Sequence, residues 1–375
     1  MTRSAKLLYT ALFFLYFSPA EYAFPNSTVD TIWKLLVLAV GFCFIVLLLV
    51  KDSTNPLFWS LTLFFVSLNV VSSLMVSSDC APSEIIFDTA KQVGFCALAI
   101  YGLGRYPRDC IAAFVVAGLV ACSLNYVTYI VYYDVPGGMQ AGTINSFGRQ
   151  TAQHWFYFGS DNASLEYSLP VAAALIYYTI TYNTKWIIPT VIFSVVTLQM
   201  YIRLDSVNAT ITFVFIAICA LYALYKMRTE SKLSINRNSV IVVAIGFNLL
   251  VILVFNTESM AAYIEQLFGK SSSFLARTDI WDNAIFYFQE SPLFGQGVSN
   301  DITDILRLTY NHAHNVILQI LYQGGLLALF LFIVVMYICM RNKSCNHDLG
   351  GFIIACSIGA VFIGGTFEFH FTYVP

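Results

Sequence analysis

The chain has 375 residues, of which 58% are hydrophobic and only 11% are charged, with a formal net charge of −2. Its mean hydropathy is +0.72. Soluble domains carry roughly 25% charged residues, so this composition excludes an ordinary soluble protein, and a nearly neutral chain predicts no nucleic-acid partner. We expect an integral membrane protein whose residues 1–375 form one helical domain in the lipid bilayer.

Apolar runs of about the length that crosses a bilayer recur along the whole chain. They predict an all-α polytopic fold with about 11, possibly 12, transmembrane helices. The runs lie near residues 6–24, 33–50, 57–76, 93–104, 111–133, 168–182, 186–202, 210–225, 239–256, 316–340 and 351–372. The fourth run is short, and we expect its helix to begin earlier, near Ile85. The first lacks a small-residue cleavage site, so we interpret it as an uncleaved span rather than a signal peptide.

Charge placement predicts the orientation of these spans. If Met1 lies inside, the inner segments hold twelve of the nineteen Lys and Arg residues and only four acidic residues. Basic residues are enriched in cytoplasmic loops of membrane proteins. The sequence therefore predicts a cytoplasmic N-terminus and a multi-pass topology.

Two long outer loops, at about residues 134–167 and 257–315, are the predicted location of the active site. Functional residues concentrate in loops that a rigid scaffold positions. ATP and nucleotide-activated sugars are cytoplasmic, so group transfer on the outer face needs an activated donor that arrives in the membrane. A polyprenyl-diphosphate sugar is such a donor.

The second outer loop contains the most informative segment. Arg277 and Trp281 are four residues apart and would share one face of a short helix. Pro292, Gly295 and Gly297 are predicted to end that helix and turn the chain.

Two histidines follow at the start of the apolar helix that begins at Val316. A lone interfacial histidine often makes only structural hydrogen bonds, but His312, His314 and Asn315 crowd one turn. A neutral imidazole could take a proton from a sugar hydroxyl, and a cationic one could hold the leaving group. The sequence leaves both roles of His314 open, and it predicts that His312 points elsewhere.

The apolar helix after these histidines carries a polar stripe and two glycines. Asn315, Gln319 and Tyr322 continue at helical spacing, and polar groups in a span usually face the bundle interior. Gly324 and Gly325 are expected to let a neighbouring helix approach closely.

Four arginines lie on the predicted outer face, which otherwise avoids positive charge: Arg149, Arg203, Arg277 and Arg307. Arginine binds phosphate oxygens bidentately and stays protonated. The alternative is a local ion pair, such as Arg277 with Asp279. The surroundings of Arg277 favour a diphosphate-binding role for it.

The first outer loop contains an aromatic run, Trp155 to Phe158, which we interpret as an anchor in the headgroup region. Among the nine cysteines, only Cys80 lies clearly in an outer loop, so no outer disulfide framework is expected. The sequence contains no metal-ligand spacing and no nucleotide-binding motif. We expect neither a metal nor a cofactor.

The segment with Arg277, Trp281, Pro292, Gly295, Gly297, His314, Asn315 and Gly325 resembles the outer loop of the O-antigen polymerase and O-antigen ligase superfamily. The topology is also similar over most of the chain, whereas the motif covers about residues 277–328.

The resemblance implies a metal-independent glycosyltransferase of the bacterial cytoplasmic (inner) membrane, with a GT-C-like architecture. Its substrate would be an undecaprenyl-diphosphate-linked oligosaccharide, and flippase and chain-length regulator proteins are possible partners. It assigns catalytic roles to His314 and Arg277. Substrate-binding roles would fall on Arg203, Arg149, Trp281, His312 and Asn315.

Two departures from the family pattern bear on the reaction. Arg203 is followed by Leu204 and Asp205 rather than by small residues, and Leu326 follows Gly325 where a ligase would have a small or aromatic polar residue. The second departure favours a capsular, exopolysaccharide or O-antigen repeat-unit polymerase over a ligase. A lipid-glycan transporter is the alternative from another class, although the predicted spans contain almost no charge and show no inverted repeat.

Overall fold

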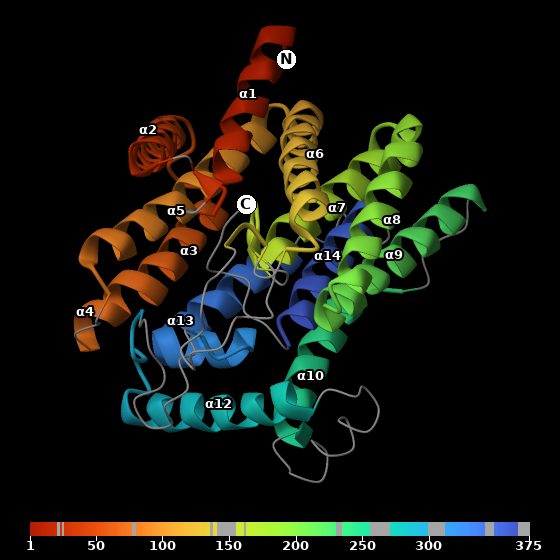
Figure 1. Cartoon of the computed structure of the whole chain (residues 1–375). Helices are drawn as coiled ribbons and strands as arrows, with labels where there is room; N and C mark the ends of the chain where they lie inside the picture. The colour runs from red at the N-terminus through yellow and green to blue at the C-terminus, as the bar shows by residue number, and fades with distance from the viewer. Residues whose placement is uncertain are drawn as a thin grey trace.

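The computed structural model shows an all-helical bundle with one small hairpin (Figure 1). It describes residues 1–20, 23–24, 26–76, 80–135, 138–140, 155–160, 163–229, 235–255, 271–298, 312–341 and 349–366. The helices are α1 (Arg3–Tyr16), α2 (Ser27–Lys51), α3 (Pro56–Phe65), η2 (Val66–Val71), α4 (Ser72–Val76), α5 (Pro82–Arg105), α6 (Pro107–Tyr132), η3 (Gly138–Gln140), α7 (Ala163–Thr181), η4 (Thr184–Trp186), α8 (Ile187–Arg203), α9 (Val207–Arg228), α10 (Arg237–Phe255), α12 (Ser271–Glu290), α13 (Val316–Arg341) and α14 (Leu349–Gly364). The strands β1 (Trp155–Phe156) and β2 (Gly159–Ser160) pair antiparallel.

The helices begin where the sequence supplies a cap. Asn26 and Asn55 accept hydrogen bonds from the backbone N–H groups three residues later, each at 3.0 Å. Pro56, Pro82 and Pro107 stand in the first turn of α3, α5 and α6, where a missing N–H group costs no helical hydrogen bond. These local signals divide the apolar sequence into separate helices.

Every predicted apolar run overlaps a helix within the described residues, and the all-α class is confirmed. Within the described residues, six helices are long and apolar enough to cross a membrane: Ser27–Lys51, Pro56–Val76, Pro107–Tyr132, Thr184–Arg203, Val207–Arg228 and Val316–Arg341. Arg237–Leu253 and Leu349–Gly364 are shorter apolar helices. The chain is a multi-pass membrane protein, but the predicted count of eleven or twelve spans is not confirmed.

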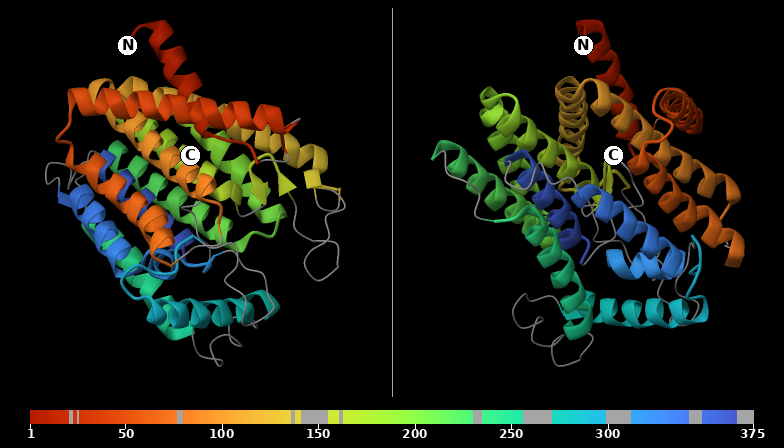
Figure 2. Two further views of the ribbon diagram at one scale, coloured as in Figure 1. Left: turned by 90° about the vertical axis from the view of Figure 1, so that its left-hand side faces the viewer. Right: turned by 180° about the vertical axis from the view of Figure 1, so that it is seen from behind.

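Close helix contacts hold the bundle together. α2 packs along α5, α1 along α6, and α14 against α7, α9 and α10 (Figure 2). A Cβ atom on Gly94 would lie 2.6 Å from the Cα atom of Gly41, so small residues let α2 and α5 approach closely. α12 lies across the end of the bundle away from the N-terminus (Figures 1 and 2).

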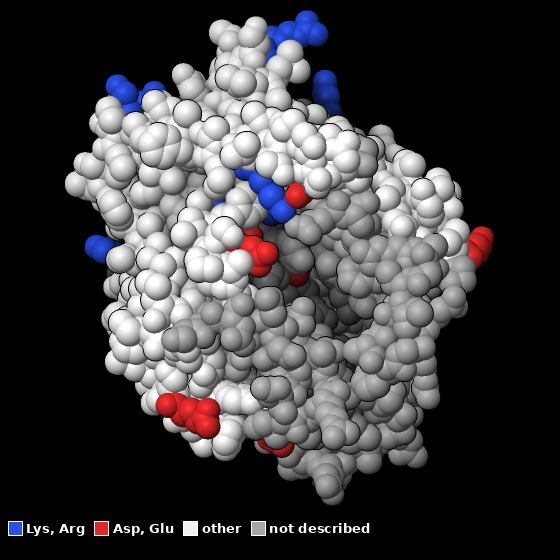
Figure 3. All heavy atoms as spheres, turned by 60° about the vertical axis from the view of Figure 1, so that its left-hand side comes forward, with Lys and Arg blue, Asp and Glu red and all other residues white. Residues whose placement is uncertain are grey.

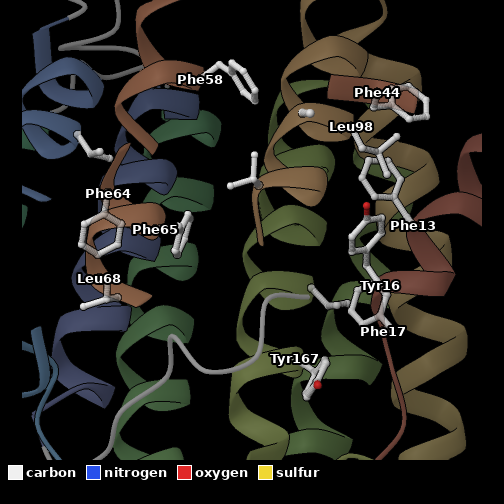
Figure 4. Close-up of a cluster of buried hydrophobic side chains, with 14 of the residues drawn as sticks. Phe13, Tyr16, Phe17, Phe44, Phe58, Phe64, Phe65, Leu68, Leu98 and Tyr167 are labelled. Atoms are coloured by element: carbon white, nitrogen blue, oxygen red, sulfur yellow. The ribbon is translucent and has the colours of Figure 1, made fainter. Parts of the chain in front are cut away.

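Aromatic side chains fill the N-terminal half of the core. Phe13 is 1% exposed, and its ring centroid lies 5.4 Å from that of Phe114 in an edge-to-face contact. Figure 4 shows Phe13, Tyr16 and Phe17 in one group and Phe64, Phe65 and Leu68 in another. The core is continuous across these helices, and edge-to-face rings add specific attraction to apolar burial.

Charged side chains are sparse on the surface and uneven between its two ends. Figure 3 shows Lys and Arg mainly toward the end that carries the N-terminus, with Asp and Glu nearer the middle and the other end. Met1 and Lys6 both pair with Asp109, at 2.8 and 2.6 Å, at the N-terminal end.

Candidate active site

A turn after α12 docks into a break in α13, at the opposite end of the molecule from the N-terminus. Four backbone hydrogen bonds join the two segments: Gln296 N to Tyr322 O at 2.7 Å, Gly297 N to Gln323 O at 2.9 Å, Leu326 N to Pro292 O at 2.9 Å and Leu327 N to Leu293 O at 3.1 Å. In an unbroken helix, the N–H groups of 326 and 327 would donate to the carbonyls of 322 and 323. The turn therefore supplies new partners for these two N–H groups and for the carbonyls of residues 322 and 323, which would be costly to leave unpaired in an apolar environment.

Three glycines make this docking possible. Gly295, Gly297 and Gly325 have φ angles of 69°, 76° and 63°, a region that side-chain-bearing residues rarely adopt. A Cβ atom on Gly295 would lie 2.5 Å from the backbone of Gln323, and one on Gly325 would lie 2.5 Å from Leu293. The prediction that Pro292, Gly295 and Gly297 end the helix and turn the chain is confirmed.

The adjacent glycines of α13 have different roles. Gly324 faces η2, where its added Cβ would lie 3.2 Å from the Cα atom of Leu68, so the predicted close helix approach is correct there. For Gly325 that prediction is wrong, because its non-helical φ and ψ of 63° and −162° break the helix.

α12 presents Trp281 to the start of α13. Trp281 is 1% exposed and belongs to a cluster with Ala313, Leu318 and Tyr322. Its indole nitrogen has no hydrogen-bond partner among the described residues. Arg277 lies one turn earlier on α12. Its Cα atom is therefore on the same face of the helix as that of Trp281. The side chain of Arg277 lies outside what the structure describes.

The two histidines are neighbours. Their ring centroids are 4.1 Å apart, and the His314 backbone N–H group donates to His312 Nδ1 at 3.3 Å. The expectation that His312 points elsewhere is wrong, because α13 begins only at Val316 and both histidines precede it. An accepting Nδ1 carries no proton, so a neutral His312 holds its proton on Nε2. His314 adopts φ of 48° and is half-buried.

Asn315 is fully buried and caps α13. Its Oδ1 accepts from the N–H groups of Ile317 and Leu318, at 3.0 and 3.1 Å. Its Nδ2 donates to Asn248 Oδ1 at 3.2 Å and to the Thr366 carbonyl at 3.1 Å. All hydrogen-bonding positions of this amide are therefore used within the protein.

Arg203 is the last residue of α8, and tyrosine side chains surround it. It is exposed, and its guanidinium lies beside the Tyr129 hydroxyl. Its carbonyl accepts from the Tyr133 hydroxyl at 3.3 Å. The rings of Tyr126 and Tyr129 stack with centroids 5.6 Å apart. Arg149, the predicted arginine of the first outer loop, lies outside the described residues.

Arg203 and the histidines lie at the same end of the bundle. Asn208, just after the Arg203 turn, donates from Nδ2 to the Gly364 carbonyl at 2.8 Å. The next carbonyl, that of Gly365, accepts from Val316 N at 2.7 Å. The end of α14 thus joins the start of α9 to the start of α13.

The aromatic run of the first outer loop packs inward, which corrects its interpretation as a membrane anchor. Phe156 is 0% and Phe158 is 3% exposed, and Phe158 stacks on Tyr167 with centroids 4.2 Å apart. The hydroxyl of Tyr157 is partly enclosed, and burial raises its pKa to about 12. The side chain of Trp155 lies outside what the structure describes.

Several buried polar residues escaped sequence analysis. Asn69 lies in the π-helical segment η2, and its Nδ2 donates to Gln92 Oε1 at 2.9 Å. Gln323 Nε2 donates to Asn69 Oδ1 at 2.9 Å. The polar stripe of α13 thus continues through Gln323 to η2 and α5. Asparagine and glutamine inside apolar runs are the sequence signal that could have indicated this network.

Two ionisable residues also lie inside the bundle. Lys91 on α5 and Glu166 on α7 are each 7% exposed. The charges of Asp88 and Glu166 interact electrostatically with the Lys91 ammonium group. The prediction of almost no charge within the spans overlooked Lys91, because α5 begins at Pro82, well before the predicted apolar run. No group of three His, Cys, Asp or Glu residues suited to a metal ion occurs within the described part of the chain.

Comparison with known proteins identifies one similarity. Residues 192–333 match the family model described as O-antigen ligase. The match includes Arg203, Arg277, Trp281 and the histidine turn, and it confirms the resemblance to the O-antigen polymerase and ligase superfamily predicted from the sequence. No curated protein and no solved structure matches the chain.

Proposed function

From this similarity to the O-antigen ligase and polymerase superfamily, we propose that the protein is a polymerase of undecaprenyl-diphosphate-linked oligosaccharide repeat units. The product would be a capsular polysaccharide, exopolysaccharide or O-antigen. One observation supports the proposal: Trp281 of α12 packs against Ala313, which lies between the two neighbouring histidines. Arg203 lies at the same end of the bundle.

The proposed reaction needs no metal or cofactor. An acceptor sugar hydroxyl oxygen bonds to C1 of the donor sugar while the bond from C1 to the diphosphate oxygen breaks. The electron pair leaves with undecaprenyl diphosphate, and the hydroxyl proton passes to a base. His314 would accept that proton. Arg277 and Arg203 would stabilise the charge that develops on the diphosphate.

The charge distribution supports a location on the outer face of the bacterial inner membrane. Lys and Arg gather mainly toward the end that carries the N-terminus, whereas α12, whose Trp281 packs against Ala313 of the histidine turn, lies across the opposite end. Cytoplasmic ends of membrane proteins are the basic ones. The proposed N-terminus is therefore cytoplasmic, and a flippase would supply the lipid-linked substrate.

An O-antigen ligase is the second candidate, and the description of the matching family favours it. A ligase would transfer the finished glycan to another acceptor, whereas a polymerase joins two lipid-linked units. The residue after Gly325, Leu326, supports the polymerase. Supplying lipid-linked units with no second acceptor separates the two, because only a polymerase then makes longer lipid-linked chains.

Cells that carry His314→Ala test the enzyme against the transporter. If His314 assists glycosyl transfer, lipid-linked single repeat units should accumulate on the outer leaflet, where a glycan-specific lectin binds them on intact cells. If the protein moves the lipid across the membrane, the lectin should bind only after permeabilisation. Normal polymer in this variant would remove His314 from the mechanism.

A further inference from the structure

A fully buried amide cluster lies directly beneath the histidine turn. Asn248 on α10 is 0% exposed, as are Asn315 and Thr366. Asn248 Nδ2 donates to the Thr366 hydroxyl at 3.2 Å and to the Phe362 carbonyl at 3.1 Å. Its Oδ1 accepts from Asn315 Nδ2. The cluster joins the outer ends of α10, α13 and α14.

The Thr366 hydroxyl is the centre of this cluster. It accepts from Asn248 Nδ2 and donates to the Phe362 carbonyl at 2.9 Å. The backbone carbonyl of the same residue accepts from Asn315 Nδ2. In an apolar interior, each unmade bond of such a network leaves a buried polar group unsatisfied.

The cluster restricts the backbone on the C-terminal side of His314. Asn315 follows His314 directly. The side chain of Asn315 is fixed because it accepts two hydrogen bonds and donates two. On the N-terminal side, the Ala313 N–H group donates to Gln319 Oε1 at 2.6 Å. His314 therefore adopts its φ of 48° between two anchored neighbours.

We infer that Asn248, Asn315 and Thr366 are positioning residues that set the place of the His314 imidazole for glycosyl transfer. The inference rests on the proposed function. It gives Asn315 a different role from the substrate contact expected from its sequence, because its amide is saturated by the protein. A displacement of about 1 Å at a catalytic group can lower a rate by roughly a hundredfold.

The test uses the full-length protein in proteoliposomes with purified lipid-linked repeat units. Thr366→Val keeps the shape of the side chain but removes the hydroxyl bonds to Asn248 and the Phe362 carbonyl. We expect kcat to fall roughly tenfold, with KM for the lipid-linked unit within about twofold, since the catalytic group is displaced while the binding residues remain. Thr366→Ser keeps the hydroxyl and should restore most of the rate.

Thr179→Val is the matched control. Thr179 is 2% exposed, and its hydroxyl bonds to the Leu175 carbonyl at 2.8 Å and to the Thr190 hydroxyl at 2.7 Å. It lies near the inner end of α7, where the same substitution removes similar bonds. Both valine variants should lose similar thermal stability, and only Thr366→Val should lose kcat.

A double variant distinguishes positioning from a general effect. In the His314→Ala background, adding Thr366→Val should leave the residual rate unchanged, because the residue it positions is gone. A further tenfold loss there, or an equal kcat loss in Thr179→Val, would overturn the inference. If His314→Ala keeps the full rate, or if the wild-type protein transfers no sugar, the result contradicts the proposed function itself and not only the positioning role.

Discussion

The aromatic core of the N-terminal half and the histidine turn of the C-terminal half are built on opposite principles. Around Phe13, the helices α1, α5 and α6 bury aromatic rings against one another. Around His314, a helix is broken, a turn fills the break, and the buried contacts are hydrogen bonds. The packing of the first region depends on the volume and hydrophobicity of its side chains. The structure of the second region depends on particular hydrogen-bonding atoms and backbone angles.

Gly295→Ala should have the largest effect, because the added Cβ meets the Gln323 backbone and the residue has φ of 69°. We expect the turn to leave the break in α13 and polymer synthesis to be lost. Gly104→Ala is the control, since nothing lies within 4 Å of its added Cβ. Polymer gels and membrane protein levels measure both variants, and normal polymer from Gly295→Ala would contradict the docking.

Phe13→Ala should reduce stability without a specific loss of kcat. Phe13 is 1% exposed and contacts Phe95 and Phe114, and emptying such a site costs about 3–5 kcal/mol. The fluorescence-monitored melting temperature should fall, while folded protein keeps its turnover. A loss of kcat at full stability would mean that the two regions are more tightly coupled than their packing indicates.

Arg277→Lys keeps the charge but loses the planar fork for two phosphate oxygens. Losing one charge-assisted hydrogen bond costs roughly 1.5–3 kcal/mol, which corresponds to about tenfold to a hundredfold in rate. Transfer in proteoliposomes should fall by that factor at normal protein levels. If the lysine variant matches wild type, Arg277 serves only as a local ion-pair partner.

Tyr129→Phe should have the smallest effect. It removes the hydroxyl beside the Arg203 guanidinium but keeps the ring between Tyr126, Tyr133 and Phe156. Removing this polar neighbour of the guanidinium should raise KM for the lipid-linked donor by about 1 kcal/mol, or roughly fivefold. Tyr126→Phe is the matched control and should leave KM unchanged, whereas equal shifts in both variants would argue against an Arg203-specific contact.

The sequence could predict helices and motifs but not the contacts that join them. Hydropathy indicated the helix around α13, but the Gly324-Gly325 pair within it was interpreted as a site of close helix packing and not as a break. The expectation that the fourth helix begins near Ile85 agrees to within three residues with the start of α5 at Pro82. Asn248 and Asn315 are 67 residues apart, and only the fold shows that they bond to one another.

The most direct test supplies purified protein in proteoliposomes with one kind of lipid-linked repeat unit and measures the release of undecaprenyl diphosphate. The account predicts one diphosphate released for each glycosidic bond formed, together with lipid-linked chains of two or more repeats. His314→Ala should release almost none. Movement of the substrate between leaflets without release of undecaprenyl diphosphate would contradict the account and indicate a transporter.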